Sequence, residues 1–280
     1  MQKIFLCLCV IFMVAASFGG DSFNGNEICV PTPLEAKVPI IMYHLVTTNG
    51  RYLGRDGITP DALRQDIKYL HENGYTTIVV QDLINYVNDG VPLPQKPVML
   101  TFDDGNYSDY KYLLPLLEEF DMRAVAAILG RPTDKYTLER ERTPKADFPN
   151  MTWPEVLALH ESGRVEIQNH SYDLHGSRGS GRKHGESMDA YRTRLSKDLT
   201  MLQARCLEKL GVEPTAFIYP LGFISEGSKE ILMELGFKGS FSCESGMAVV
   251  RYGEPDSLFK MKRNNRANDK PVAEILRGLK

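Results

Sequence analysis

Two adjacent acidic residues, Asp103 and Asp104, follow an apolar run at 97–100 and precede Gly105. The apolar run is typical of a buried strand, so the pair is expected at a strand end. Like charges this close resist joint ionisation unless a proton, a cation or a metal neutralises one of them. The alternative is a solvent-exposed turn, because Asp-Asp-Gly is ordinary turn composition. On this stretch alone the two interpretations carry equal weight.

A second stretch, His170-Ser-Tyr-Asp-Leu-His175, shifts that balance. On a helix the two histidines would lie about 140° apart, so they can face one point only from a loop. The glycine- and serine-rich residues 176–185 fit a loop. Two imidazoles with a carboxylate form an open site for zinc or a similar divalent ion, with positions left for water. The sequence therefore favours a metal site.

The aspartate pair can divide its work, because adjacent residues leaving a strand point in different directions. One carboxylate binds the metal, and the other accepts a proton from water whose pKa the metal lowers towards about 7. This predicts a hydrolase that attacks a carbonyl group. The backbone N–H of Leu221 is the candidate donor to the oxyanion, and His44 is the candidate acid for the leaving group.

Strand and helix patterns alternate about seven times along the chain, which predicts a parallel sheet with helices outside it. A chain of this length can close such a sheet into a barrel, although the pattern alone also allows an open, doubly wound sheet. In both folds, chemistry lies at the carboxyl ends of the strands, where His44, Asp103, His170 and Tyr219 are expected. Residues 131–150 are polar and charged and are expected to form a long surface excursion.

The composition, with 42% hydrophobic and 25% charged residues among 280, is typical of a globular protein. The net charge of −3 without long runs of one sign argues against nucleic-acid binding. No stable protein partner is predicted. Outside the apolar N-terminal run the cysteines are Cys29, Cys206 and Cys243, which match no disulfide framework or zinc-finger spacing. They are interpreted as buried or idle thiols, although one bridge remains an alternative.

The N-terminal residues 1–20 have the layout of a secretory signal, with Lys3, an apolar run and then small residues. The run is short for a membrane span of about 20 residues, which favours a secreted or cell-surface protein over a retained anchor. Residues 21–36 are expected to form a linker, and 37–280 a single catalytic domain.

The motifs at 101–105 and 170–175, in this order, resemble those of the polysaccharide deacetylases of carbohydrate esterase family four, the NodB homology group. The similarity covers about residues 36–265 and includes Met42-Tyr43-His44 and the stretch 217–222. The resemblance implies an α/β fold, a distorted, TIM-like (β/α)7 barrel. It also implies removal of acetyl groups from an N-acetylated glycan.

Residue by residue, the resemblance implies that Asp103 is the general base and that Leu221 is the oxyanion donor. Asp104, His170 and His175 would hold the divalent metal, with zinc (Zn2+) the first choice and Co2+ or Ni2+ the alternatives. Tyr172, Tyr219 and Pro220 are expected to bind substrate, although both tyrosines could simply pack.

The sequence also departs from the common pattern of this family. One more residue separates the two histidines than in many members, as in the branch that acts on poly-N-acetylglucosamine. No histidine follows His184, so the usual late acid is absent, and that branch takes its acid from the position of His44. No aspartate could be assigned to tune this acid. Arg263 is a candidate for contacting the base.

Several functions stay open on sequence grounds. The leading prediction is a secreted, metal-dependent deacetylase of an exopolysaccharide or of peptidoglycan. An O-acetyl esterase acting on xylan would use the same site, and a glycan-binding protein without catalysis is a further alternative. A phosphatase with an aspartate nucleophile ranks low, because those enzymes use Asp-x-Asp and would leave the histidines idle.

Overall fold

The computed structural model describes residues 33–142, 149–177 and 179–279. The predicted signal peptide, the linker up to residue 32 and Cys29 lie outside these residues. Strand β1 (Glu35–Val38) begins inside the predicted linker 21–36, so regular structure starts two residues before the expected boundary. None of the helices in the described ranges is both long and apolar enough to cross a membrane.

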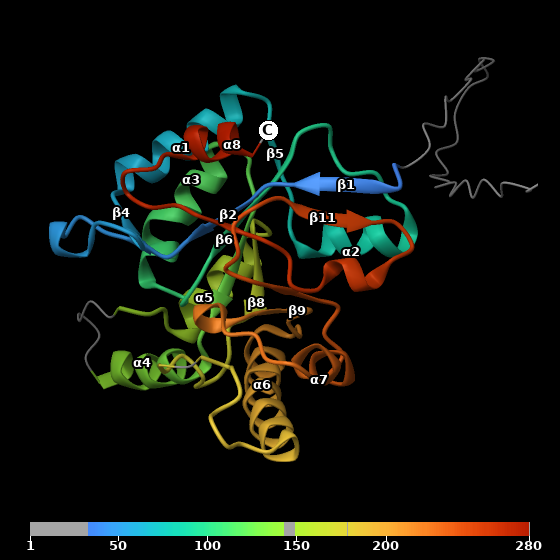
Figure 1. Cartoon of the computed structure of the whole chain (residues 1–280). Helices are drawn as coiled ribbons and strands as arrows, with labels where there is room; N and C mark the ends of the chain where they lie inside the picture. Colours follow the sequence, from blue (N-terminus) through green and yellow to red (C-terminus); the bar gives the residue numbers. More distant parts are fainter. Residues whose placement is uncertain (1–32, 143–148, 178, 280) are drawn as a thin grey trace, which may run out of the picture.

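A parallel sheet forms the centre of the molecule, with helices around it (Figure 1). Its strand order is β10-β9-β8-β7-β6-β2-β12, and β5 pairs with β6. The strands are β2 (Ile40–Tyr43), β5 (Thr76–Thr77), β6 (Pro97–Phe102), β7 (Ala124–Ile128), β8 (Val165–Asn169), β9 (Ala216–Ile218), β10 (Gly239–Phe241) and β12 (Asn264–Asn265).

The segment 261–265 reaches both edges of this sheet. Met261 forms a parallel bridge with Phe241 of β10, and its N–H donates to Ser240 O at 2.8 Å. Four residues later, Asn265 of β12 pairs with Met42 of β2 at the other edge. The sheet is therefore curled towards a barrel, as the predicted (β/α)7 fold requires, and it is not an open, doubly wound sheet.

Both faces of the sheet are buried, which explains why its strands are almost continuously apolar. Ile41 and Leu100 pack in one core cluster with residues of α1 (Pro60–Glu72), α3 (Leu114–Glu119), α5 (Trp153–Glu161) and α8 (Val272–Gly278). Met99 and Val125 point into the other cluster, which includes residues of α2 and of the antiparallel pair formed by β1 and β11.

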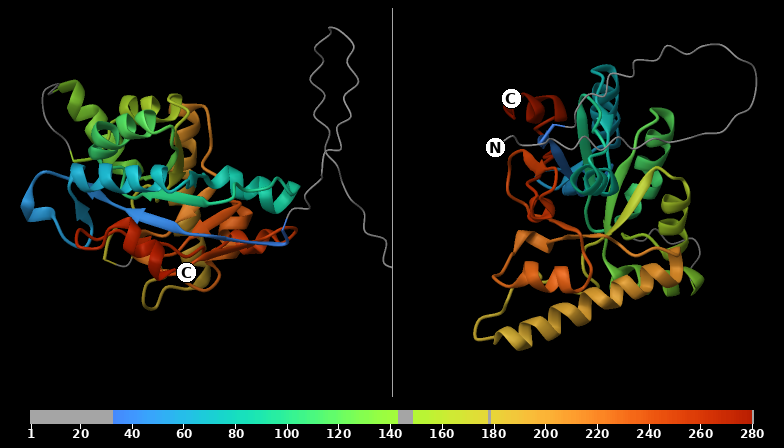
Figure 2. Two further views of the ribbon diagram at one scale, coloured as in Figure 1. Left: turned by 90° about the horizontal axis from the view of Figure 1, so that it is seen from above. Right: turned by 90° about the vertical axis from the view of Figure 1, so that its right-hand side faces the viewer.

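The helices and the remaining short strands connect and cover this sheet. Figure 2 shows α6 as a long helix along one side of the molecule. The helices are α1 (Pro60–Glu72), α2 (Val80–Asp89), α3 (Leu114–Glu119), α4 (Gly130–Arg142), α5 (Trp153–Glu161), α6 (Met188–Leu210), α7 (Ser228–Glu234) and α8 (Val272–Gly278). The other strands are β3 (Leu45–Val46), β4 (Gly57–Ile58) and β11 (Ala248–Arg251), and a π-helical turn (Asp109–Leu113) leads into α3.

Helix α1 begins at a strong local start signal. The Thr59 hydroxyl accepts a hydrogen bond from the Ala62 N–H at 3.1 Å, and Pro60 occupies the first turn. Proline is favoured there because its missing N–H has no helical partner at that position anyway. Leu63 and Ile67 share one face of the helix and are fully buried.

Helix α4 contradicts the surface excursion expected at 131–150. Its sequence is polar all round, so it lacks the apolar stripe that signals a helix. Tertiary contacts stabilise it instead. The Asp134 carboxylate accepts hydrogen bonds from Trp153 Nε1 at 2.7 Å and from the Tyr172 hydroxyl at 2.8 Å, and Thr133 Oγ1 donates to Leu129 O.

Candidate active site

The residues singled out from the sequence follow the carboxyl ends of neighbouring parallel strands. His44 follows β2, Asp103 and Asp104 follow β6, His170 follows β8, and Tyr219 follows β9. Because these strands run in the same direction, their carboxyl ends lie at one rim of the curled sheet. The prediction that one rim gathers these positions is confirmed.

Asp104, His170 and His175 form a compact cluster of potential metal ligands. Nε2 of His175 lies 3.0 Å from Oδ1 of Asp104, and Nε2 of His170 lies 3.5 Å from the same oxygen. One ligand atom from each of the three residues falls within 4.8 Å of the others. The structure therefore brings together the triad that the sequence predicts.

The hydrogen bonding of the cluster fits a cation. Nδ1 of His170 lies 2.9 Å from the carbonyl oxygen of Ile218, which can only accept, so the proton of the neutral ring is on Nδ1. Nε2 then presents a lone pair towards Asp104, whose buried Oδ1 has no hydrogen-bond partner among the described residues. Lone pairs that converge in this way are the donor set of a divalent ion such as zinc, with the second ring nitrogen held by a carbonyl.

The charges of the cluster are strongly coupled. Burial acts to raise the pKa of Asp104, but the imidazoles of His170 and His175 outweigh it and lower this pKa far below its usual range. The pKa of His175 is raised because its ring lies against the Asp104 carboxylate. A proton on His175 and a metal would thus compete for one position.

Asp103 is held by a buried arginine. Nη1 and Nη2 of Arg263 donate to Oδ1 and Oδ2 of Asp103 at 2.7 and 2.8 Å, and both side chains are almost completely buried. Nε of Arg263 donates to the Ser242 carbonyl at 3.0 Å. Burial acts to raise the pKa of Asp103, but the guanidinium outweighs it and keeps this pKa below its usual range. The predicted contact between Arg263 and Asp103 is confirmed, and it fixes an ionised carboxylate in one orientation.

His44 lies beside the same carboxylate. Its Nε2 is 4.0 Å from Oδ2 of Asp103, and its side chain is 21% exposed, so the ring is reachable from solvent. Nδ1 is buried and has no hydrogen-bond partner among the described residues. His44 thus lies at the site, and no carboxylate among the described residues accepts a hydrogen bond from its Nδ1.

Three residues of the rim have the left-handed backbone conformation that disfavours side chains. Asp104 has φ 76°, Ser171 has φ 85° and Leu221 has φ 58°. Strain of this kind persists where the surrounding structure enforces it, often at functional sites. Leu221 lies in the 3-10 turn Pro220–Gly222, directly after β9, with its side chain 49% exposed.

The structure shows what surrounds Tyr172, Tyr219 and Pro220, which the sequence predicts to bind substrate. Tyr219 is fully buried, and its hydroxyl lies 2.9 Å from Ser228 Oγ, so its side chain supports the turn from below. Pro220 is buried as well. The Tyr172 side chain is half-buried, and its hydroxyl donates to Asp134 at 2.8 Å. The sequence placed these residues near the site but could not show which way their side chains point.

Asp198 of α6 was not identified from the sequence. Its Oδ1 accepts the backbone N–H of Tyr172 at 2.7 Å, and its Oδ2 accepts that of Asp173 at 2.8 Å. These are the middle residues of the loop that carries His170 and His175. An acid in a polar helix gives no sequence signal for such a role, because the contact spans 25 residues or more.

The two cysteines that the structure describes do not take part in a disulfide. Cys206 and Cys243 are free thiols, the first buried and the second half-buried. Burial raises the pKa of Cys206 to about 12. The interpretation of Cys206 as a buried thiol is confirmed.

Comparison with known proteins is consistent with this site. A poly-beta-1,6-N-acetyl-D-glucosamine N-deacetylase of Escherichia coli O157:H7 is 31% identical over 238 residues, covering 78% of this chain but 35% of the relative. The chain thus spans about a third of that relative. IcaB from Ammonifex degensii is 25% identical, with a TM-score of 0.66 over 81% of this chain and 91% of that one.

A de-N-acetylase from Aggregatibacter actinomycetemcomitans has the same fold, with a TM-score of 0.73, 22% identity and coverage of 87% of this chain and all of that chain. The family model described as polysaccharide deacetylase matches residues 90–240, more than half of the 280 residues. The matched region contains both aspartates, both histidines and the Leu221 turn. The chain belongs to the polysaccharide deacetylase family.

Proposed function

We propose that this protein hydrolyses N-acetyl groups of an N-acetylglucosamine-containing polysaccharide in a metal-dependent reaction. The observation that carries the proposal is the pairing of two differently held carboxylates. Asp103 is locked by Arg263, whereas Asp104 faces His170 and His175 with an oxygen that lacks a hydrogen bond. Asp104 would thus bind the metal, and Asp103, which is not part of that cluster, would accept the proton.

Asp104, His170 and His175 would hold a divalent cation, with zinc the first choice because the donor set is two imidazoles and one carboxylate. When bound, the metal polarises a carbonyl oxygen and acidifies water. Asp103 accepts the proton of the attacking water. Arg263 keeps this carboxylate ionised and oriented before the proton transfer, and by lowering its pKa makes it a weaker base.

The other two steps need a donor to the oxyanion and an acid. The backbone N–H of Leu221 is assigned to the oxyanion, because a strained turn after β9 presents it at the rim. His44, beside Asp103, is assigned to protonate the leaving amine. An ester leaving group needs this proton much less than an amine does, so His44 distinguishes an amidase from an O-acetyl esterase.

The substrate is proposed from the relatives. The E. coli relative is named for poly-beta-1,6-N-acetyl-D-glucosamine, and an exopolysaccharide of this kind is the first choice here, ahead of peptidoglycan. Residues 1–20 support export, with a catalytic domain from about residue 35 onwards. N-terminal sequencing of the protein recovered outside the cell tests the cleavage of this stretch.

The decisive experiment measures acetate release from a panel of N-acetylglucosamine polymers, with the metal-loaded protein and after chelation. We expect release that chelator abolishes and zinc restores. Asp103→Asn should lower kcat by about 10²–10⁴-fold, the range for loss of a general base. No acetate from any acetylated glycan by the metal-loaded protein would refute the proposal.

His44→Ala separates the two hydrolase classes. We expect this variant to lose most amide cleavage while it retains cleavage of an aryl acetate ester. His160, on α5, provides the matched control, and His160→Ala should retain both activities. Equal loss of both activities in His44→Ala would remove the acid role.

A further inference from the structure

The loop 170–175, which carries both histidines of the metal cluster, is held by the amino end of α4. The N–H groups of Gly130 and Arg131, in the first turn of this helix, donate to the carbonyl oxygens of Ser171 and Tyr172 at 3.1 and 2.8 Å. First-turn N–H groups have no acceptor within their own helix, so the loop supplies the acceptors that they need. Helix α4 thus begins directly on this loop.

The Tyr172 side chain extends this contact along the helix. Its ring packs against Gly130, where an added Cβ atom would lie 2.4 Å from Cδ2 of Tyr172, so only glycine allows this close approach. Its hydroxyl donates to the Asp134 carboxylate at 2.8 Å, about one turn further along α4. Ring and hydroxyl together fix Tyr172 against two successive turns of one helix.

Asp134 has other partners that keep it in place. Its Oδ1 accepts a hydrogen bond from Trp153 Nε1 at 2.7 Å, and its Oδ2 accepts one from Arg205 Nε at 3.2 Å. Trp153 is the almost fully buried first residue of α5, and Arg205 belongs to α6. Three helices therefore meet at this carboxylate, and the Tyr172 hydroxyl is bound to a fixed acceptor.

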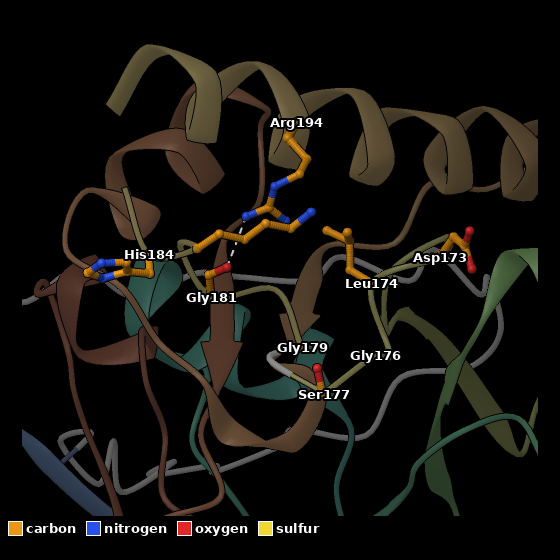
Figure 3. A pocket seen from close by; sticks show the side chains of 9 residues that line it. Asp173, Leu174, Gly176, Ser177, Gly179, Gly181, His184 and Arg194 are labelled. Atoms are coloured by element: carbon orange, nitrogen blue, oxygen red, sulfur yellow. Dashed lines mark hydrogen bonds between the residues drawn. The ribbon is translucent and has the colours of Figure 1, made fainter. Parts of the chain in front are cut away.

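The next residue of the loop is tied to the same helix. The Asp173 carboxylate pairs with Nη1 of Arg131 at 2.5 Å. Figure 3 shows this carboxylate pointing away from Leu174 and from the pocket that Leu174 lines. Both partners of this ion pair are largely exposed, so we expect it to hold the loop less firmly than the half-buried Tyr172 does.

We propose that Tyr172 is a positioning residue for the metal site, which holds His170 and His175 in place by docking their loop on α4. This role differs from the substrate contact that the sequence predicts. The inference rests on the proposed function, because it takes the two histidines as metal ligands. A side chain that only contacted substrate would leave the metal affinity unchanged, so the two roles lead to different results.

Tyr172→Phe tests this role, because it removes the hydroxyl and keeps the ring. We expect its zinc affinity, measured by competition with a chromogenic chelator, to fall about fivefold to tenfold, the effect of losing one hydrogen bond. The visible absorption spectrum of the Co2+-loaded protein should change as well, since its bands depend on ligand geometry. Tyr252→Phe, which removes a hydroxyl from a tyrosine 42% exposed after β11, should change neither property.

A double-variant cycle tests whether the hydroxyl acts through Asp134. Asp134→Ala should also weaken zinc binding, and Tyr172→Phe should have no further effect in the Asp134→Ala background. An equal loss from Tyr172→Phe in both backgrounds would contradict the role of this hydrogen bond.

The positioning role is overturned if Tyr172→Phe keeps the zinc affinity and the cobalt spectrum of the parent, whether or not its KM for a glycan rises. Zinc affinity is measured without substrate. Absence of acetate release would therefore refute the proposed function without deciding this inference, and unchanged zinc binding in Tyr172→Phe would refute this inference without affecting the deacetylase proposal.

Discussion

At the scale of single residues, the ion pair between Arg263 and Asp103 separates the roles of the two neighbouring aspartates, Asp103 and Asp104. Both charges are removed from water, so each depends on the other for its solvation. The bidentate contact leaves Asp103 no freedom to turn towards the metal cluster. Asp104, one residue later and at φ 76°, points instead to the histidines.

Removal of Arg263 should therefore destabilise the protein more than removal of an arginine from a surface ion pair. We expect Arg263→Met to lower the free energy of unfolding by about 3–5 kcal/mol, because it leaves Asp103 buried and unpaired. The Asp103→Asn/Arg263→Met double variant should be more stable than Arg263→Met, since no buried charge remains. Urea unfolding measures all three proteins.

Arg251→Met is the matched control, because Arg251 pairs with Glu35 at the surface and is 45% exposed. Arg251→Met should lower the free energy of unfolding by no more than about 1 kcal/mol. A similar cost for Arg251→Met and Arg263→Met would contradict the importance of the buried pair.

At the scale of elements, α6 holds the loop between His170 and His175 from behind. Asp198 accepts two successive backbone N–H groups of that loop, and Asn169 accepts the Ser171 N–H at 2.8 Å. Leu199 O accepts from the Asn169 amide at 3.2 Å, which ties the end of β8 to the same helix. The longer spacing of the two histidines is thus supported by a helix rather than by the loop itself.

Asp198→Asn should weaken metal binding without removing a ligand. An amide can accept only one of the two N–H bonds, so the loop gains freedom and the ligands lose their fixed geometry. Groups that support metal ligands typically contribute 10–100-fold in affinity, and we expect a loss of about 10-fold. Competition with a chromogenic chelator measures it without any substrate.

Asp189→Asn serves as the control on the same helix, because Asp189 is exposed in the first turn. This variant should bind metal as the parent does. Unchanged metal affinity in Asp198→Asn would show that the loop keeps its geometry without α6.

At the scale of the whole molecule, closure of the barrel brings distant segments to one rim. The segment 261–265 bridges β10 and pairs with β2, and Arg263 lies within it. Arg266 continues this closure, since its Nε donates to the buried Asp66 of α1 at 2.5 Å and its backbone N–H donates to Met42 O. The site is therefore complete only when the last strand is in place.

The pH dependence of stability also belongs to the whole molecule. Burial raises the pKa of Glu166 on β8 to about 7, although hydrogen bonds from the Gln81 N–H and from Gln168 oppose the shift. Between pH 4.5 and 7 the folded protein then binds more protons than the unfolded chain does. Glu166 consequently makes stability fall as pH rises through this window.

Glu166→Gln removes this titration. Relative to the parent, the variant should gain stability between pH 4 and pH 8, by at most about 3 kcal/mol. Chemical unfolding at the two pH values measures the difference, and Glu161→Gln on α5, which is exposed, should show no such change. A pH-independent difference between parent and Glu166→Gln would contradict the raised pKa.

The sequence by itself predicted the alternation of strands and helices and the grouping of two histidines with a strand-end aspartate, whereas the choice of Asp103 as the base came from the family resemblance. Apolar runs and helix caps are local signals, and the His170–His175 spacing excludes a helix by geometry alone. The contact of Arg263 with Asp103 could be suggested only through family resemblance, because 160 residues separate them.

Tertiary structure decided the rest. Helix α4 has no apolar stripe and depends on contacts of Asp134, so its sequence lacks the hydrophobic periodicity that would predict a helix. Tyr172 and Tyr219 lie where the sequence placed them, but packing ties the Tyr172 hydroxyl to Asp134 and buries Tyr219 completely. Side-chain direction and long-range ion pairs depend on which elements pack together. The support of the loop by Asp198 therefore exists only in the folded chain.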